Sequence, residues 1–130
     1  MLTTKTITKA AATAGATIDF SGDWVNELGS KMKIAMAGQA LTGTYESPVS
    51  GGGGSVKGDL VGFVDGDLIS FVVNWTTPAS LTAWTGQLVD VAGNDVIKTL
   101  WLLVQNIDDP SEPNGLWKST LAGADDFRRL

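Results

Sequence analysis

Short runs of alternating apolar and polar residues, separated by turn residues, constrain this 130-residue chain more than any other feature. Successive side chains of a β-strand point to opposite faces, so a two-residue period is typical of half-buried strands. Runs rich in Val, Ile, Thr and Trp that recur every ~8–12 residues favour an all-β sandwich or barrel. Six such runs follow residue 20: Trp24–Leu28, Lys31–Met36, Leu41–Ser47, Leu68–Trp75, Leu81–Val89 and Val96–Gln105.

The segments between the runs have the composition of turns. Three of them are short and contain glycine: Ala37–Gln39, Asp65–Gly66 and Ala92–Asp95. Asp-Gly between two strands predicts a hairpin with a type I′ turn, whose two central residues need positive φ. The run Gly51–Ser55 cannot lie inside a strand and predicts a loop between the third and fourth strands, either natural or an engineered linker. The loop Asp108–Gly115 precedes the last strand.

Length and composition fit one folded domain. A hydrophobic content of 43% over 130 residues is enough for a buried core. We expect this domain to span residues 21–130. Residues 1–20 carry Lys5 and Lys9 ahead of an Ala/Thr run that is too polar for a secretory signal. They predict a flexible N-terminal leader or an expression remnant.

The residue types that the sequence lacks argue against several classes of function. There is no cysteine and no histidine, which removes thiolate nucleophiles, Cys/His zinc sites and histidine acid–base chemistry. A net charge of −5 without a basic cluster disfavours nucleic-acid binding. No run approaches the ~20 apolar residues of a membrane span. We therefore expect no metal, cofactor, nucleic-acid or membrane partner. Zero cysteine fits a cytosolic and an exported protein equally.

Residue parity places polar side chains on the same face as the apolar ones. Each such face is mostly apolar toward one end and carries hydroxyl, amide or carboxyl groups toward the other. An inward polar group without a hydrogen-bond partner costs roughly 1–3 kcal/mol, so a filled core would not need these groups. A barrel of about eight strands has room for one small ligand. The inward polar candidates are Asn26, Ser30, Tyr45, Ser47, Thr82 and Asp125.

Four of the five tryptophans lie late on their runs or at a loop edge, where they could line a pocket. A tryptophan in a β-domain is more often ordinary core, as we expect for Trp24, and a lone carboxylate is more often on the surface. Parity alone therefore leaves a lumenal ligand site and a plain structural core both open, and it identifies no ligand. The four tryptophans are Trp75, Trp84, Trp101 and Trp117.

Two other functional classes fit the sequence less well than a polar binding lumen. A lipocalin-like carrier of an apolar ligand would not need six convergent polar groups. A glycoside hydrolase needs two facing carboxylates. Parity places Asp125 inward but puts Asp23 and Glu46 on the opposite face. We therefore expect a binding protein and no catalytic residues, with the lipocalin-like carrier as the alternative.

Five segments together resemble the streptavidin branch of the avidin family, in that family's order and across residues 21–130. The resemblance implies an eight-stranded antiparallel up-and-down β-barrel that binds biotin at its open end. It further implies a bacterial protein that is secreted or periplasmic. The segments are Gly22–Ser30, Leu41–Ser47, Thr82–Gly86, Thr99–Leu103 and Trp117–Asp125.

The resemblance assigns roles at the ureido end of biotin. Asn26, Ser30 and Tyr45 would donate hydrogen bonds to the ureido oxygen. Ser47 and Asp125 would accept hydrogen bonds from the two ureido N–H groups. Such a set polarises the ureido group and strengthens each bond in a dry pocket.

The resemblance also assigns contacts around the ring and tail of biotin. Thr82 would meet the thioether sulfur, and Ser80 would bond the valeryl carboxylate. Further side chains would wall the bicyclic ring, and backbone N–H groups of the following loop would help to hold the carboxylate. The ring walls are Trp75, Trp84, Trp101, Leu28 and Leu103, and the N–H groups belong to Val49, Ser50 and Gly51.

Assembly and lid are the last implications of the resemblance. Trp117 is similar to the family tryptophan that lids the pocket of a neighbouring subunit, which implies a homotetramer built as a dimer of dimers. Dimeric members typically lack that tryptophan and carry cysteines, which this chain does not. The glycine run replaces a stiffer lid, and ordering glycines costs more entropy. We therefore expect biotin to dissociate faster than from streptavidin.

Overall fold

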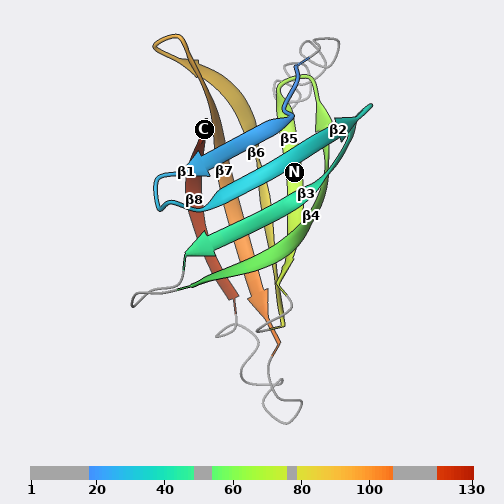
Figure 1. Ribbon diagram of the computed structural model, residues 1–130, viewed down its shortest axis with the longest axis vertical. Helices are drawn as coiled ribbons and strands as arrows, with labels where there is room; N and C mark the ends of the chain where they lie inside the picture. Colours follow the sequence, from blue (N-terminus) through green and yellow to red (C-terminus); the bar gives the residue numbers. More distant parts are fainter. Residues whose placement is uncertain (1–17, 49–53, 76–78, 107–119) are drawn as a thin grey trace, which may run out of the picture.

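The computed structural model describes residues 18–48, 54–75, 79–106 and 120–130 as a closed barrel of eight antiparallel strands (Figure 1). Each strand pairs with its neighbours in sequence, and β8 pairs back with β1. The predicted all-β, eight-stranded up-and-down barrel is confirmed. The strands are β1 Gly22–Asn26, β2 Lys31–Ala37, β3 Ala40–Pro48, β4 Ser55–Asp65, β5 Leu68–Trp75, β6 Ser80–Val91, β7 Asn94–Gln105 and β8 Thr120–Arg129. No helix within the described ranges is long and apolar enough to cross a membrane.

The three short connections are hairpin turns at one end of the barrel, and the geometry of one of them differs from the prediction. Asp65 pairs with Leu68, so the central residues are Gly66 and Asp67. Of these, only Gly66 has positive φ, at 60°. Glycine first with positive φ is the pattern of a type II′ turn, so the predicted type I′ turn at Asp65–Gly66 is wrong.

The connection between β6 and β7 is the turn in which both central residues have positive φ. Ala92 lies at φ 52° and Gly93 at φ 85°. This is the type I′ pattern, and it is unfavourable for an alanine because of its Cβ. The N–H of Gly93 donates to Asp90 Oδ1 at 2.8 Å, which helps to hold the turn.

Alternate residues of the strands point into the barrel, as the two-residue period predicts. Phe71 and Trp84 stack with ring centroids 5.1 Å apart, and Phe127 meets both edge-on. The inner face is fully buried around these rings and forms one continuous core. Its apolar members include Trp24, Met32, Ile34, Leu41, Leu60, Ile69, Val73, Ile97 and Phe127.

The segment before β1 closes the end of the barrel that carries the hairpin turns. Phe20 is completely buried, and its carbonyl accepts a hydrogen bond from Trp24 Nε1 at 2.9 Å. Its N–H donates to Met36 Sδ at 3.1 Å. Ile18 also packs on the core. Residues 18–20 are thus packed on the barrel, although the sequence analysis assigned them to the leader; residues 1–17 lie outside the described ranges.

Candidate ligand-binding site

The inward polar residues gather in the half of the barrel away from the hairpin turns. This half is formed where β1, β3, β5 and β7 end and where β2, β4, β6 and β8 begin. Their hydrogen bonds connect neighbouring strands around the lumen. Asn26, Ser30, Tyr45, Thr82 and Asp125 are buried there, and Ser47 and Ser80 are half-buried.

Asn26 is oriented by the turn that follows it. Its Oδ1 accepts the backbone N–H groups of Leu28 at 3.0 Å and Ser30 at 2.9 Å. The amide oxygen is therefore occupied by the turn, and the Nδ2 donor faces the lumen, where it donates to Tyr45 Oη at 3.4 Å. Asn26 can thus present a donor, and not an acceptor, to a ligand.

The same turn sets the position of Leu28. β1 ends at Asn26, so Leu28 belongs to the turn and does not continue the inner face of the strand. Its side chain is 74% exposed in the single chain. Leu28 therefore lies in the turn at the mouth of the barrel, whose N–H groups at Leu28 and Ser30 bond the Asn26 side chain, and its contact with biotin stays a prediction.

Tyr45 holds its hydroxyl in the lumen between two tryptophans. Its ring stacks on Trp84 at 4.7 Å and meets Trp75 edge-on at 5.4 Å. Burial raises the pKa of Tyr45 above its ordinary value, and the charges of Asp125 and Glu27 raise the pKa further. The phenol stays protonated at physiological pH and remains a hydrogen-bond donor.

Ser30 and Ser47 face each other across β2 and β3. Ser30 Oγ donates to Ser47 Oγ at 3.3 Å. A hydroxyl can donate one bond while accepting others, so either oxygen can turn to a ligand without leaving the other buried and unsatisfied. The pair supplies one donor and one acceptor at adjacent positions.

Asp125 is the carboxylate that points into the described part of the lumen. Its Oδ2 accepts a hydrogen bond from Trp84 Nε1 at 2.9 Å, and its backbone carbonyl accepts from Thr99 Oγ1 at 2.9 Å. Burial raises the pKa of Asp125; the bond from Trp84 works against that rise, and the negative charge of Glu27 adds to it. Thr99 was not among the predicted site residues, although it lies on the inward face of its run.

The predicted aromatic walls lie beside the polar residues, and Trp75 and Trp84 both contact the ring of Tyr45. Trp75 Nε1 donates to Thr82 Oγ1 at 2.8 Å, which fixes the indole against β6. Trp101 lies over Gly123 of the neighbouring strand, so closely that a Cβ at position 123 would overlap its ring. A glycine at that position is therefore what lets the indole lie flat on the wall. Leu103 is half-buried two residues further along β7.

This arrangement suits a small planar ligand with its own donors and acceptors. Asn26, Ser30 and Tyr45 present donors, and Ser47 and Asp125 present acceptors. Tryptophan faces flank them on the apolar side. The described residues contain no group of three or more acidic side chains that could hold a metal ion. Four predicted contacts, Val49, Ser50, Gly51 and Trp117, lie outside the described residues.

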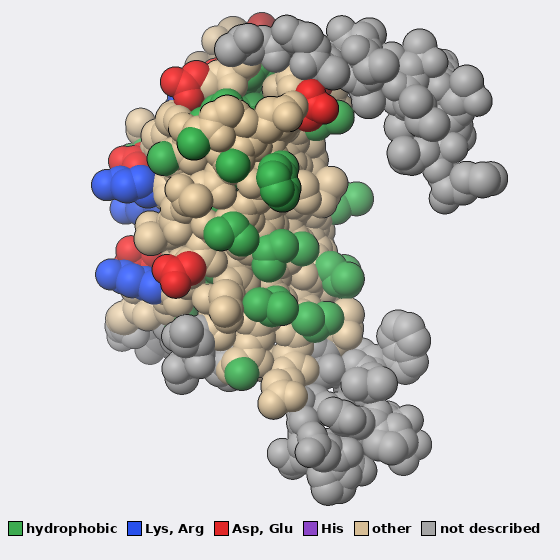
Figure 2. All heavy atoms as spheres, turned by 90° about the vertical axis from the view of Figure 1, so that its right-hand side faces the viewer, with side chains coloured by type: hydrophobic (Ala, Val, Ile, Leu, Met, Phe, Trp, Pro, Cys, Tyr) green, Lys and Arg blue, Asp and Glu red, His purple; other side chains and the backbone are tan. Residues whose placement is uncertain are grey.

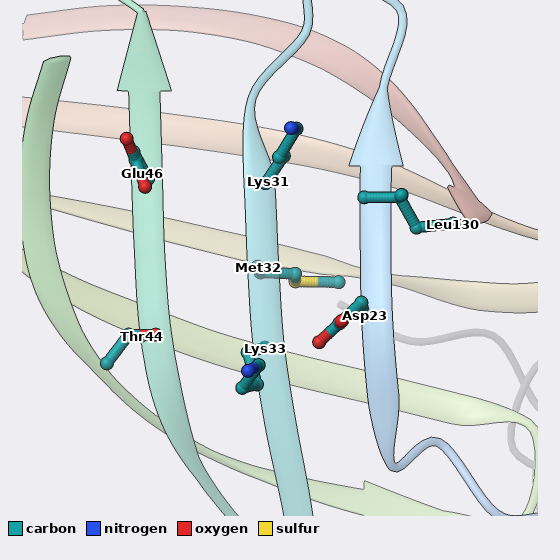
Figure 3. Close-up of a pocket in the computed structure, with 7 residues that line it drawn as sticks. All are labelled: Asp23, Lys31, Met32, Lys33, Thr44, Glu46 and Leu130. Atoms are coloured by element: carbon teal, nitrogen blue, oxygen red, sulfur yellow. The ribbon is translucent and has the colours of Figure 1, made fainter. Parts of the chain in front are cut away.

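A surface groove of about 380 Å³ lies elsewhere, on the outer wall of β1, β2 and β3 (Figure 3). Lysines and carboxylates alternate across it, with Asp23 opposite Lys33 and Lys31 opposite Glu46 in the strand pairing. The groove is a surface of mixed charge, and none of the inward polar residues described above lines it.

Comparisons with known proteins agree with this geometry. The sequence matches the model described as "Avidin family" over residues 14–130. Avidin of Gallus gallus is 32% identical over 120 residues, which cover 85% of this chain and 77% of that protein. Avidin-related protein 4/5 of Gallus gallus is 35% identical over 118 residues, with the same coverage.

A solved structure of the same fold extends the comparison. The crystal structure of Xenavidin superposes with a TM-score of 0.72 at 31% identity, covering 85% of this chain and 96% of that one. The narrower expectation of a bacterial, streptavidin-like protein has no support here, since the curated relatives are from Gallus gallus. The confirmed barrel, its polar lumen and these matches show that the chain belongs to the avidin family.

Proposed function

We propose that this barrel binds biotin non-covalently in its lumen. The observation that carries the proposal is the grouping of three donors with two acceptors beside aromatic walls. A ureido group has one strong acceptor oxygen and two N–H donors, so it can satisfy all five side chains at once. Membership in the avidin family supports the same ligand.

The site residues form two groups, one for the ureido group of biotin and one for its rings and sulfur. Asn26, Ser30 and Tyr45 would donate to the ureido oxygen, and Ser47 and Asp125 would accept from the ureido N–H groups. Trp75, Trp84 and Trp101 would pack on the rings, with Thr82 at the sulfur. The donors and walls are already in place, so binding orders few side chains and loses little entropy.

Binding without catalysis is part of the proposal. No cofactor is needed for it. Two facing carboxylates would be needed for glycoside hydrolysis. Within the described lumen Asp125 points inward, while Glu46 lies exposed on the outer wall and bonds Ser55 Oγ at 2.7 Å. The polar cluster also disfavours a lipocalin-like carrier, because an apolar ligand would leave those groups unsatisfied.

Tryptophan fluorescence tests the proposal directly. We expect biotin to change the emission saturably and to raise the thermal midpoint, because a ligand that binds only the folded state stabilises it. Asp125→Ala should weaken both responses, whereas Asp59→Asn on the outer wall should leave them intact. A long-chain fatty acid tests the lipocalin-like alternative. No response to biotin, or a stronger response to the fatty acid, would overturn the assignment.

We propose that the chain forms a homotetramer, a dimer of dimers, through the outer wall of the barrel. Figure 2 shows hydrophobic side chains grouped on one face of the barrel. Monomers rarely expose large contiguous apolar patches. Val72, Ala83 and Leu102 are paired across three strands, so their side chains are neighbours. Exposed apolar residues on the outward faces of β4 to β7 include Val61, Phe63, Val72, Leu81, Leu100, Leu102 and Val104.

Light scattering during gel filtration tests the assembly. We expect the mass of four chains, and a smaller assembly for Leu102→Asp, which places a charge in the centre of the patch. Thr42→Asp on the outer wall of β3 is the control and should keep the parent mass. A monomeric parent at micromolar concentration contradicts the proposal. The predicted contact of Trp117 with a neighbour's pocket remains a prediction.

Two further expectations stay proposals. Secretion is supported by the relation to avidin of Gallus gallus, whereas a bacterial or periplasmic setting has no support from the comparisons. Cell fractionation tests it: recovery inside the cells would contradict secretion. Faster release of biotin than from streptavidin is tested by the dissociation of labelled biotin, and an equally slow release would contradict it.

A further inference from the structure

Glu27 lies beside the ligand site, although its parity points it away from the lumen. β1 ends at Asn26, whose last partner on β8 is Phe127. One position further, Glu27 Oε2 accepts the backbone N–H of Asp126 at 3.0 Å. The side chain thus continues the hydrogen-bond ladder that the β1 backbone has left. Its charge is thereby fixed next to the part of β8 that carries Asp125.

The groups around Asp125 include a second negative charge and no free cation from the described strands. Glu27 of the β1–β2 turn and the Asn26 amide lie on one side, and from across the lumen come the indole of Trp84 and the phenol of Tyr45. On β7, Thr99 bonds the Asp125 carbonyl. Lys98, also on β7, is paired with Asp126 Oδ2 at 3.2 Å on the surface.

We propose that Glu27 is a positioning residue for the biotin site, which acts through Asp125 and moves the acid-induced loss of biotin affinity to higher pH. This inference rests on the proposed function. Glu27 is an exposed residue of the β1–β2 turn. In this proposal it influences Asp125, which remains the buried acceptor for biotin.

The mechanism follows from hydrogen-bond polarity. Asp125 Oδ2 is engaged by Trp84, so Oδ1 is the oxygen left to accept a ureido N–H. When Asp125 takes up a proton, it offers an O–H to a group that also donates, and that bond is lost. Burial raises the pKa of Asp125 and the Glu27 charge raises it further, so Glu27 moves this loss of binding to higher pH. One coupled proton changes affinity by at most about tenfold per pH unit.

Glu27→Gln is the decisive variant. Its amide oxygen can still accept the N–H of Asp126, so the fold is retained while the charge is removed. Competition with labelled biotin would give the affinity of both proteins between about pH 4 and about pH 8. We expect similar affinities at the alkaline end and a fall in affinity that begins at lower pH in the variant. Asp59→Asn removes an equal charge from the outer wall and should keep the parent profile.

A ligand-free measurement separates the two proposals. The Trp84 indole N–H donates to Asp125, so the NMR shift of that proton should report the titration of Asp125 in the free barrel. The midpoint of this pH-dependent change should move to lower pH in Glu27→Gln, and the change should be absent in Asp125→Asn. If the parent does not bind biotin at neutral pH, the proposed function fails, while the indole signal still decides the coupling. If biotin binds and the two pH profiles coincide, the role of Glu27 is overturned.

Discussion

The two ends of this barrel are built from the same eight strands but solve opposite problems. At the end with the hairpin turns, Phe20 fills the opening, and Arg129 ties the segment before β1 to the end of β8. At the other end, Asn26, Ser47 and Asp125 keep polar atoms inside the wall. The first end gains stability from apolar burial, whereas the second gives some of it up for recognition.

The difference shows how one strand pattern can serve both purposes. Inward residues of β1 change from Trp24 to Asn26 within one alternation, and those of β8 change from Phe127 to Asp125. These four side chains are all buried, so the polar pair requires partners that the apolar pair does not. Mutations that affect stability and binding separately should therefore map to different ends.

The largest expected effect is at the closed end. Phe20→Ala removes a fully buried ring, so we expect the free energy of unfolding of the ligand-free protein to fall by about 3–5 kcal/mol. Denaturant titration measures it. Biotin affinity should change by less than about 0.5 kcal/mol, or roughly twofold, because the site is remote. Leu130→Ala removes an exposed side chain at the same end and should leave stability nearly unchanged.

The converse result is expected at the mouth. Tyr45→Phe keeps the ring stacked on Trp84 but removes the hydroxyl proposed to donate to biotin. We expect affinity to fall by roughly 1–3 kcal/mol, or about 5- to 150-fold, by competition binding. The free energy of unfolding should change little, since the hydrogen bond that the hydroxyl accepts from Asn26 Nδ2 is long, at 3.4 Å. A loss of stability larger than the loss of binding would break the comparison.

A smaller effect should appear in the pH dependence of stability. The folded-state pKa of Asp125 is raised above 3.8, mainly by burial. Between the unfolded and folded pKa values the folded state holds the extra proton, so stability falls as pH rises through that window. Thermal midpoints of the ligand-free protein should show this fall, and Asp125→Asn should remove that component. An equal fall in the variant would assign it to other groups.

The smallest effect is expected for the clamp at the closed end. Arg129 donates to Asp19 O at 2.8 Å, pairs with Asp95 at 3.2 Å and lies 4.4 Å from the Trp24 ring centroid. Its side chain is 41% exposed, so solvent weakens the charge interactions. We expect Arg129→Met to cost about 1 kcal/mol in denaturant titration, with less effect at high salt. A loss as large as that for Phe20→Ala would contradict this ranking of the two contacts.

The strand faces and most inward site residues follow from the sequence because a two-residue period leaves only two choices of face. Tyr45, Thr82 and Asp125 lie where parity places them. The resemblance supplied strand number and ligand, which alternation could not. Parity has no meaning once the backbone leaves the strand, and therefore it gives no direction for Leu28 in the turn after Asn26.

Long-range contacts account for the rest of what the sequence did not reveal. Phe20 precedes the first strand, and nothing local shows that Trp24 and Met36 hold it in place. The alternation of Ile18 and Phe20 was the local signal that this segment packs on the barrel. Glu27 was not predicted as a site residue because its proposed role depends on a hydrogen bond with Asp126, 99 residues away in sequence.

The closure between β1 and β8 also has a kinetic consequence. Every other pairing joins neighbours in the chain, and such hairpins form in about 1–10 μs. β1 and β8 share only three paired positions, from Trp24 with Arg129 to Asn26 with Phe127. Until the intervening hairpins have formed, pairing across so long a stretch of chain has a large entropy cost of loop closure. The β1–β8 pairing should therefore be the last to form during folding and the first to exchange its amide protons. Arg129 and Glu27 contact its two ends.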